Sequence, residues 1–445
     1  MPDELAVPSG RANGSACGQV FPSMSGGGHF PLHAACPAVP QLASAQRDMI
    51  RVLAFSSLYP NAALPRHGIF LQHRLAYLAA EPGMSVRMLA PVPWFPRSLH
   101  KVRQYAAFAK APAMSQARGI VALHPRYPVL PKIGTSVAAV LMAGAMVRTL
   151  LRIRAEGFDF DVIDAYYLYP DGVAAAVLGA LFGRPIVLTA FGSDVSLLPS
   201  IAAAREQILW AVRRAEVTTA VCRALRDRLV ELGADAGRIE VILHGVDLEL
   251  FRPPEDREAL RRRLGFDRPT LLSAGHLIPR KGNTFAIGAL ARVPDVQLVL
   301  AGTGPEEEVL RRQAERIGVH DRVRFLGHLD QSALRDLMAA ADGLVLCSDR
   351  EGIANVLLEA MACGTPVAAT AIWGTPEVVC VPEAGVLFYD RTEEAVAAGI
   401  RALLAAPPDR AMTRRWAEKF TWTDTAQRHA TAIRSACRAV RHTAA

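Results

Sequence analysis

Two glutamates separated by seven residues are the most informative chemical groups in the sequence. Glu351 and Glu359 enclose the residues Gly-Ile-Ala-Asn-Val-Leu-Leu, which follow the apolar run Gly343–Cys347 and are predicted to begin a helix. The free amides at a helix N-terminus favour an anion such as a diphosphate. Because Glu351 precedes the helix and Glu359 lies about one turn inside it, we expect them to bind different hydroxyls of one ligand and not one metal. The alternative is an acidic helix cap followed by an exposed helical glutamate.

Two adjacent cations follow another apolar run, Leu271–Ala274. Arg280 and Lys281 stand directly before Gly282, a few residues beyond the predicted strand. Guanidinium and ammonium groups at such a place can neutralise a pyrophosphate. An Arg-Lys pair by itself is more often solvated surface, so the interpretation depends on its combination with the two glutamates.

The elements that would position these groups alternate between short apolar runs and helical patterns. This alternation predicts two doubly wound, Rossmann-like α/β domains with the ligand in the cleft between them, outside the carboxyl ends of the strands. The predicted strands are 51–55, 85–90, 162–165, 186–189, 217–221 and 239–243 in the first half, and 271–274, 296–301, 323–326, 343–347 and 367–369 in the second.

The domain boundaries follow from composition. Residues 1–48 are rich in Gly, Pro, Ser and Ala, and we expect a disordered extension or a misassigned start. The two domains are predicted over 49–247 and 248–415, with a proline-containing linker near Val246–Arg257. One last amphipathic helix is expected within 416–445.

Overall composition limits the class of protein. The chain has 445 residues, 51% of them hydrophobic and 21% charged, which excludes a disordered chain or a small disulfide scaffold. Seven scattered cysteines without a Cys-x-x-Cys pair favour a reducing compartment and argue against a zinc site. The longest apolar helical stretch, Val137–Val147, is about half of the ~20 residues that a membrane span needs.

The net charge of +8 is concentrated in residues 82–155, which hold eleven Lys and Arg and no Asp or Glu. Aromatic residues such as Trp94 and Tyr105 lie among these cations. The mixture favours contact with an anionic membrane surface. The alternatives are a solvated basic surface without a partner and nucleic-acid binding, for which the sequence has no recognised motif.

Several motifs in combination make the chain similar to the retaining glycosyltransferases of family 4, which have the GT-B architecture of two facing Rossmann-like domains. The resemblance covers about residues 51–438 and is greatest to bacterial exopolysaccharide and teichuronic-acid-type enzymes. The motifs are G-x-L-x-x-x-K-G (Gly275–Gly282), A-G-x-G-P (Ala301–Pro305), F-L-G (Phe325–Gly327), the E-x7-E of the two glutamates, and the N-terminal Y-P-x-x-x-x-P-x-H-G-I-F (Tyr59–Phe70).

The resemblance implies that residues 248–415 bind a nucleotide sugar. Glu351 would contact hydroxyls of the donor sugar, Glu359 would accept a hydrogen bond from the nucleotide ribose, and Lys281 with Arg280 would clamp the diphosphate. The remaining donor-binding positions are His276, Gly327, Gly352, Ile353 and Asn355.

It further implies that residues 49–247 bind the acceptor and that the final helix crosses back onto them. Catalysis would require Glu351, Lys281 and Asp194. The acceptor-side positions are His67, Gly68, Tyr166, Asp171 and Phe191.

Three positions depart from common family patterns. His276 replaces an arginine, and Phe191 and Tyr166 replace histidines, so the sequence does not identify the polar catalytic group of the N-terminal domain. Asp194 and Asp171 remain as acceptor-side carboxylates, although either can equally cap a helix.

These features predict a cytoplasmic enzyme, peripheral at the inner face of the membrane. It would move a sugar, with retention, from a UDP- or GDP-sugar to a lipid-linked saccharide, without a cofactor, metal or nucleic-acid partner. The Asp159-Phe-Asp161 triplet is not interpreted as a metal site, because it precedes its strand and therefore lies away from the cleft. The alternatives are a catalytically impaired nucleotide-sugar-binding paralogue and a hydrolysing nucleotide-sugar epimerase. The sequence does not fix the base, the sugar, the acceptor or the oligomeric state.

Overall fold

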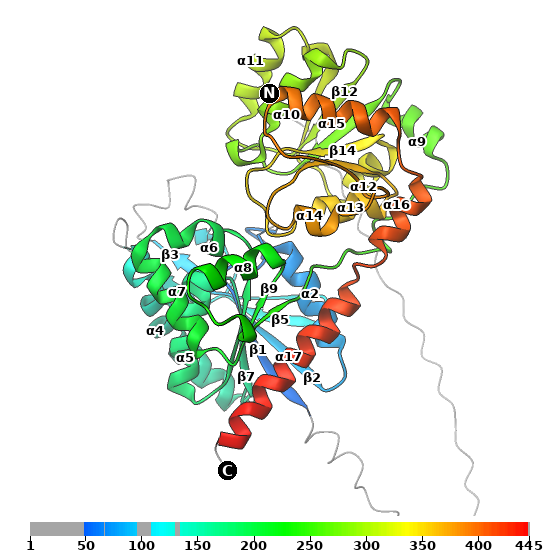
Figure 1. The fold of residues 1–445 in the computed structure, drawn as a ribbon. Helices are drawn as coiled ribbons and strands as arrows, with labels where there is room; N and C mark the ends of the chain where they lie inside the picture. The colour runs from blue at the N-terminus through cyan, green and yellow to red at the C-terminus, as the bar shows by residue number, and fades with distance from the viewer. Residues whose placement is uncertain (1–48, 66, 96–107, 130–133, 444–445) are drawn as a thin grey trace, which may run out of the picture. The chain divides into compact units, whose positions relative to one another are not determined.

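The computed structural model describes residues 49–65, 67–95, 108–129 and 134–443 (Figure 1). The predicted extension 1–48 lies outside the described residues. Residues 48–445 form one compact unit, and its strands make two large, mainly parallel sheets and one short two-stranded sheet. This is the α/β class and the pair of Rossmann-like sheets that the sequence predicts.

The N-terminal sheet has the strand order β10-β9-β8-β7-β1-β2-β5-β4, and all its pairs are parallel except β4 with β5. β7 and β8 lie near its middle and are buried along their whole length. Their sequences, Val-Ile-Asp-Ala-Tyr and Ile-Val-Leu-Thr-Ala, are mainly apolar, which suits central strands because helices cover both faces of a parallel sheet. The bounds are β1 Ile50–Phe55, β2 Met84–Leu89, β4 Met114–Ala117, β5 Ile120–Leu123, β7 Val162–Tyr166, β8 Ile186–Ala190, β9 Val217–Ala220 and β10 Ile239–Val241.

The C-terminal sheet is wholly parallel, in the order β13-β12-β11-β14-β15-β16. This order reverses direction between β11 and β14, so the loops after these two strands meet at the switch point where α/β proteins bind ligands. The bounds are β11 Thr270–Ala274, β12 Gln297–Ala301, β13 Val323–Gly327, β14 Gly343–Leu346, β15 Val367–Thr370 and β16 Gly385–Phe388.

Helices connect the strands, and several begin at a residue whose side chain caps the first turn. Asp330 accepts a hydrogen bond from the Ala333 amide, and Thr392 does the same for Ala395, which satisfies amides that have no partner inside the helix. The helix bounds are α2 Ile69–Ala80, α4 Gly134–Ala155, α5 Val173–Phe182, α6 Ser193–Ser196, α7 Ala202–Arg214, α8 Arg223–Glu231, α9 Arg257–Leu264, α10 Asn283–Ala289, α11 Glu307–Arg316, α12 Gln331–Ala340, α13 Asn355–Ala362, α14 Thr375–Val378, α15 Glu393–Ala405, α16 Arg410–Ala417 and α17 Trp422–Thr443. The short 3₁₀ and π turns are η2 Leu168–Gly172, η3 Leu198–Ser200, η4 Ala236–Arg238, η5 Pro279–Lys281, η6 Leu290–Arg292 and η7 His320–Arg322.

The last helix, α17, packs on the N-terminal sheet although it follows the C-terminal one in sequence. It lies beside α2 and contacts β7, β8 and β9 (Figure 1). Its buried stripe includes Ala430, Ile433 and Ala436, which join the cluster that contains Leu71 and Leu75 of α2. The spacing of three residues along this stripe is typical of an amphipathic helix with one covered face.

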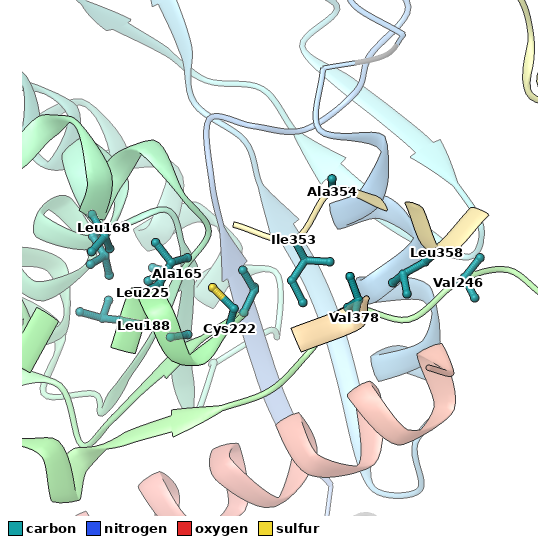
Figure 2. Packing of buried hydrophobic residues seen from close by; sticks show 14 of the residues in the cluster. Ala165, Leu168, Leu188, Cys222, Leu225, Val246, Ile353, Ala354, Leu358 and Val378 are labelled. Carbon is teal, nitrogen blue, oxygen red and sulfur yellow. The ribbon is translucent and has the colours of Figure 1, made fainter. Parts of the chain in front are cut away.

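A single apolar cluster connects the two large sheets. It extends from Leu188 of β8 through Cys222 and Leu225 to Ile353 and Leu358 at α13 (Figure 2). Burial of continuous apolar surface stabilises an assembly in proportion to the area removed from water. The loops that carry the predicted site therefore rest on one shared core.

The eleven predicted strands are all present, with ends shifted by at most two residues. Four strands inside the basic segment, β3 to β6, were not predicted; two of them, β3 Val92–Trp94 and β6 Arg126–Pro128, form the separate two-stranded sheet. The edge strand β16 was also missed. Within the described residues, no helix is long and apolar enough to cross a membrane.

Candidate functional site

A cleft of about 640 Å³ lies where the loops after strands of both sheets meet. From the N-terminal half it is lined by Leu58, Phe70, Tyr167, Phe191, Gly192, Ser193, Ser196, Leu197 and His244, and from the C-terminal half by Ile278, Pro279, Arg280, Arg350, Glu351, Gly352, Ile353 and Asn355. The lining residues of the N-terminal half are mainly aromatic or carry hydroxyl groups, and we call them the aromatic wall. Those of the C-terminal half include the charged residues, and we call them the charged wall.

The charged wall is organised around Glu351. Lys281 Nζ lies 2.6 Å from Glu351 Oε1, and Ser348 Oγ donates to the same oxygen at 2.7 Å. Arg280 Nη1 is 3.5 Å from Glu351 Oε2 and donates to the Arg350 carbonyl at 2.6 Å. Burial opposes ionisation of Glu351, but Lys281, Arg280 and Ser348 outweigh it and hold the pKa of this carboxyl below its ordinary value. The segment thus presents an ionised carboxylate beside two cations.

The loop between Glu351 and α13 passes directly against the other half of the protein. A Cβ atom on Gly352 would lie 1.9 Å from the Phe191 carbonyl oxygen, so only glycine fits this approach. No side chain caps α13 at Ala354, which leaves its first amides available to a ligand. The predicted sequence of glutamate, glycine and helix N-terminus is thus assembled at the cleft, with Ile353 and Asn355 in its lining.

Glu359 and His276 line a second pocket of about 630 Å³, together with Pro65, Ile69, Gly302, Thr303, His328, Asp330 and Gln331. A small third pocket contains Glu359 and Asn355 and thereby adjoins both. Burial raises the pKa of Glu359 to about 7. His276 is exposed, and its Nδ1 lies 3.2 Å from the Thr303 carbonyl oxygen.

Lys281 contacts Glu351 but is not itself among the lining residues of these pockets, and three other predicted positions likewise lie near the pockets without lining them. Gly327 ends β13 at a φ of +64°, directly before His328 of the second pocket. Gly68 precedes α2 at a φ of +76°, and a Cβ there would lie 2.2 Å from the Leu58 carbonyl oxygen. His67 packs edge-on against Phe108, and burial lowers the pKa of its imidazole.

Tyr166 lies in the interior and not in the cleft lining. Its hydroxyl donates to Asp164, and His429 Nε2 of α17 lies 3.3 Å away. His429 also contacts Asp164 at 2.9 Å and Arg74 of α2 at 3.1 Å. Tyr166 therefore helps to fix α17 on the sheet, which differs from the acceptor-side role expected from the sequence.

Asp171 and Asp194 are also fully buried, and the carboxylate of each accepts hydrogen bonds from backbone amides. Asp194 accepts hydrogen bonds from the amides of Leu168, Phe191 and Gly192 at 3.0, 3.2 and 2.6 Å. Asp171 accepts hydrogen bonds from the Ser57 amide at 3.1 Å and the Ser57 hydroxyl at 2.9 Å. Burial raises the pKa of both carboxyls, that of Asp171 to about 7. Both were predicted to face the acceptor; the structure instead uses them to join loops beneath the cleft.

Of the nine described residues that line the cleft from the N-terminal half, the sequence predicted only Phe191; the side chains missed include Phe70, Tyr167, Ser193 and His244. The ring centroid of Phe191, which was predicted, lies 5.1 Å from the ring centroid of Phe70 and 5.5 Å from that of His244. His244 Nδ1 reaches Asn355 Oδ1 at 2.8 Å. His244 follows β10, and a polar residue just beyond a strand end was the signal that could have identified it.

The Asp159-Phe-Asp161 triplet pairs with cations away from the cleft. Asp161 binds Arg51 at 3.1 Å, and Asp159 binds Arg184 at 2.8 Å. Among the described residues, no group of three or more His, Cys, Asp or Glu side chains is placed to hold a metal ion.

The chain matches two family descriptions in succession. Residues 83–250 match Glycosyltransferase Family 4, and residues 256–420 match Glycosyl transferases group 1. The second match contains the Glu351 segment and both cations, and the first contains most of the aromatic wall.

Individual relatives agree with these matches. The chain is 35% identical over 257 residues to a GDP-mannose-dependent alpha-(1-6)-phosphatidylinositol monomannoside mannosyltransferase of Mycolicibacterium smegmatis, covering 53% of this chain and 66% of that protein. It is 27% identical over 333 residues to the teichuronic acid biosynthesis glycosyltransferase TuaC of Bacillus subtilis, covering 73% of this chain and 82% of that protein.

The structure of Anabaena Alr3699/HepE in complex with UDP superposes with a TM-score of 0.65 at 22% identity, over 87% of this chain and all of that one. This likeness concerns the fold, which is that of the GT-B glycosyltransferases. Together with both family matches and the similar relatives it confirms the predicted resemblance, and the chain belongs to the family 4 glycosyltransferases of GT-B architecture.

Proposed function

We propose that the protein is a retaining hexosyltransferase of cell-surface polysaccharide biosynthesis. It would transfer a sugar from a nucleotide sugar to a lipid-linked saccharide. The observation that carries this proposal is the charged wall, where Lys281 and Arg280 flank Glu351 at 2.6 and 3.5 Å beside the uncapped N-terminus of α13. One carboxylate, two cations and free amides together suit a sugar linked to a diphosphate.

The chemistry follows from where charge develops. The leaving nucleotide diphosphate becomes more negative as the glycosidic bond breaks, so fixed cations and amides stabilise the transition state more than the ground state. Loss of one such contact typically costs about 3 kcal/mol, or ~100-fold in rate. In this proposal Glu351 orients the donor sugar by binding the hydroxyls of that sugar, while Glu359 accepts a hydrogen bond from the nucleotide ribose.

The proposed stereochemistry is retention by front-face displacement, as in the related family. Glu351 is the only carboxylate among the described residues that line the cleft, and it is engaged by Lys281 and Ser348. A double displacement would need a free carboxylate as nucleophile. A phosphate oxygen of the donor would then help to accept the proton of the acceptor hydroxyl.

The donor is proposed to be a UDP- or GDP-sugar, used without a metal cofactor. The relative from Mycolicibacterium smegmatis is named as GDP-mannose-dependent, and Alr3699/HepE was solved with UDP. Both nucleotides would place their diphosphate at Lys281 and their ribose at Glu359.

The acceptor is proposed to reach the cleft from an anionic membrane surface at the cytoplasmic face. The basic segment 82–155 supports this, and within it Trp94 and Met114 are 51% and 61% exposed. Two cations of this segment make contacts within the protein: Arg126 donates to the Ala111 carbonyl at 2.6 Å, and Arg154 pairs with Asp159 at 2.7 Å. Replacement of Arg97, Lys101, Arg103, Lys110 and Arg118 together spares these internal contacts. It is expected to abolish binding to anionic liposomes; unchanged binding would contradict membrane association.

A catalytically impaired, donor-binding paralogue is the second candidate. Phe191 favours it, because this residue lines the cleft at a position where the family resemblance leads us to expect a histidine. A hydrolysing nucleotide-sugar epimerase is the third, and it would turn over the donor alone without needing the basic segment.

The test is nucleotide release from a panel of UDP-, GDP- and ADP-sugars, with membrane extract as the source of acceptor. Wild type is compared with Glu351→Ala, Lys281→Ala and, as a control, the exposed Glu315→Ala. We expect release from one donor that needs the extract, persists in Glu315→Ala and falls at least ~100-fold in the two site variants. Nucleotide binding without release from any donor would favour the impaired paralogue, and extract-independent conversion of the donor would favour the epimerase.

A further inference from the structure

Tyr167 has a backbone conformation that residues with a side chain rarely adopt. It follows β7 directly, with φ 83° and ψ 115°. Such a combination is essentially restricted to glycine, and other residues pay about 1–3 kcal/mol for it. A cost of this size persists only where the surrounding structure imposes it.

Hydrogen bonds on both sides of Tyr167 impose the conformation. Its amide donates to the Thr189 carbonyl, and its own carbonyl accepts from the Gly172 amide, both at 2.9 Å. The next amide, that of Leu168, donates to the buried carboxylate of Asp194 at 3.0 Å. Hydrogen bonds therefore fix three consecutive backbone groups, which are the amide and carbonyl of Tyr167 and the amide of Leu168.

With this conformation, the side chain of Tyr167 lies in different surroundings from those of its two sequence neighbours. Tyr166 and Leu168 are completely buried in the core, whereas Tyr167 lines the cleft. Its hydroxyl lies 2.7 Å from Ser193 Oγ, which lines the same cleft. The strained conformation thus places the Tyr167 side chain in the cleft lining, beside the hydroxyl of Ser193.

The wall around Tyr167 is uncharged. The described residues of the N-terminal half that line the cleft include no Asp, Glu, Lys or Arg, and burial lowers the pKa of His244 to about 3, so its imidazole is neutral. The charged groups that suit a diphosphate are all on the opposite wall. An aromatic face with adjacent hydroxyls suits the apolar face and hydroxyl edge of an uncharged sugar ring.

We propose that Tyr167 is a specificity-determining residue that binds an uncharged sugar ring of the acceptor, and that the strained backbone after β7 places it there. The inference rests on the proposed transferase function and adds to it the chemical class of the acceptor group beside the reaction centre. It assigns this role to Tyr167 and not to Tyr166, the position that the sequence motif suggested.

The strain is tested by the matched pair Tyr167→Gly and Tyr167→Ala. Both remove the ring, but only glycine relieves the backbone. At an ordinary position glycine is the less stable of the two; here we expect Tyr167→Gly to melt about 2 °C above Tyr167→Ala. Equal melting temperatures, or the opposite order, would overturn the strained placement.

The role in acceptor binding is tested on the same variants with the responsive donor. We expect extract-dependent nucleotide release to fall ~10-fold in both, and ~3-fold in Tyr167→Phe, which keeps the ring. The KM for the donor, measured in the same extract-dependent reaction, is expected to stay within ~2-fold of wild type, because the donor-binding cations and Glu351 are not on the wall that carries Tyr167. The control is Tyr389→Ala, which removes a tyrosine that is 80% exposed.

The two possible failures are distinguishable. Wild-type protein without turnover on any donor would contradict the proposed function and this inference with it. Wild-type turnover combined with unchanged extract-dependent release in Tyr167→Ala, or with a ~10-fold rise in the donor KM of this variant, would overturn the inference alone.

Discussion

Lys281 Nζ and Glu351 Oε1 lie 2.6 Å apart, and their side chains are only 16% and 10% exposed. The contact joins the loop after β11 to the loop after β14, the two strands at the switch point of the C-terminal sheet. An ammonium group has three donors, so Lys281 can hold Glu351 and still donate to a phosphate. The ion pair therefore fixes the position of the cation on which the proposed chemistry depends.

Breaking this pair from one side is expected to destabilise the protein. Lys281→Met leaves a buried carboxylate with only the more distant Arg280 as counter-ion, and we expect a loss of about 2 kcal/mol in the free energy of unfolding. Glu351→Gln should cost less, and the double variant less than the sum of the single ones. Denaturant unfolding of the four proteins measures the coupling, while donor turnover is expected to be lost in all three variants.

The exposed pair Arg311 and Glu307 of α11, 2.9 Å apart at a spacing of four residues, is the matched control. Its coupling energy is expected to be below about 0.5 kcal/mol. Additive effects at Lys281 and Glu351, as small as at the control pair, would show that the contact has no role in the fold.

Much of the site was predictable because its residues follow strand ends. In a parallel α/β sheet the carboxyl ends of all strands meet at one edge, so glutamate, glycine and lysine motifs after β11 and β14 had to converge. The central strands were equally predictable, since strands buried on both faces are continuous apolar runs. β3, β4 and β6 are short and have no continuous apolar run, so their pattern does not identify them as strands. β5 is an apolar run, Ile-Val-Ala-Leu, that was missed.

The aromatic wall and the loops beneath it were less predictable, for two physical reasons. A sequence shows that Asp194 and Asp171 carry carboxylates, but not that both are buried and bound to backbone amides or hydroxyls. It also does not show that a strained φ turns Tyr167, and not Tyr166, to the cleft. Both features depend on contacts between loops that are distant in the chain.

Glu359 is expected to make donor use depend on pH. Its pKa is raised to about 7 by burial, so it is protonated in a growing fraction of molecules as the pH falls below 7. A protonated carboxyl is a weaker acceptor for a ribose hydroxyl. We expect kcat/KM for the donor to fall with decreasing pH, with an apparent pKa near 7, and this limb to disappear in Glu359→Gln. An unchanged limb in that variant would assign the titration to another group.

Asp171 is expected to make stability depend on pH in the opposite direction to most carboxylates. Burial raises its pKa from 3.8 to about 7 in the folded protein. Folding therefore favours its protonated form, and the stability cost appears as the pH rises from about 4 to about 7 and stays constant above. Asp171→Asn keeps the shape without the charge.

We expect Asp171→Asn to match wild type near pH 4 and to exceed it by roughly 2–4 kcal/mol at pH 8, measured by denaturant unfolding. The exposed Asp424→Asn serves as the control, with no such pH-dependent difference. A variant equally destabilised at both pH values would mean that the ionised carboxylate is the form that the Ser57 contacts stabilise.

His244 is expected to position the N-terminus of α13 through Asn355. Its Nδ1 lies 2.8 Å from Asn355 Oδ1, and rings of Phe70, Phe191 and Trp422 surround it. His244→Phe keeps a ring but loses the hydrogen bond, whereas His244→Asn keeps a donor at the δ position. We expect donor KM to rise ~10-fold in His244→Phe and to stay within ~3-fold of wild type in His244→Asn. Because His244→Asn removes more of the ring packing, a structural role alone would make it the worse variant, and that order would contradict positioning through Asn355.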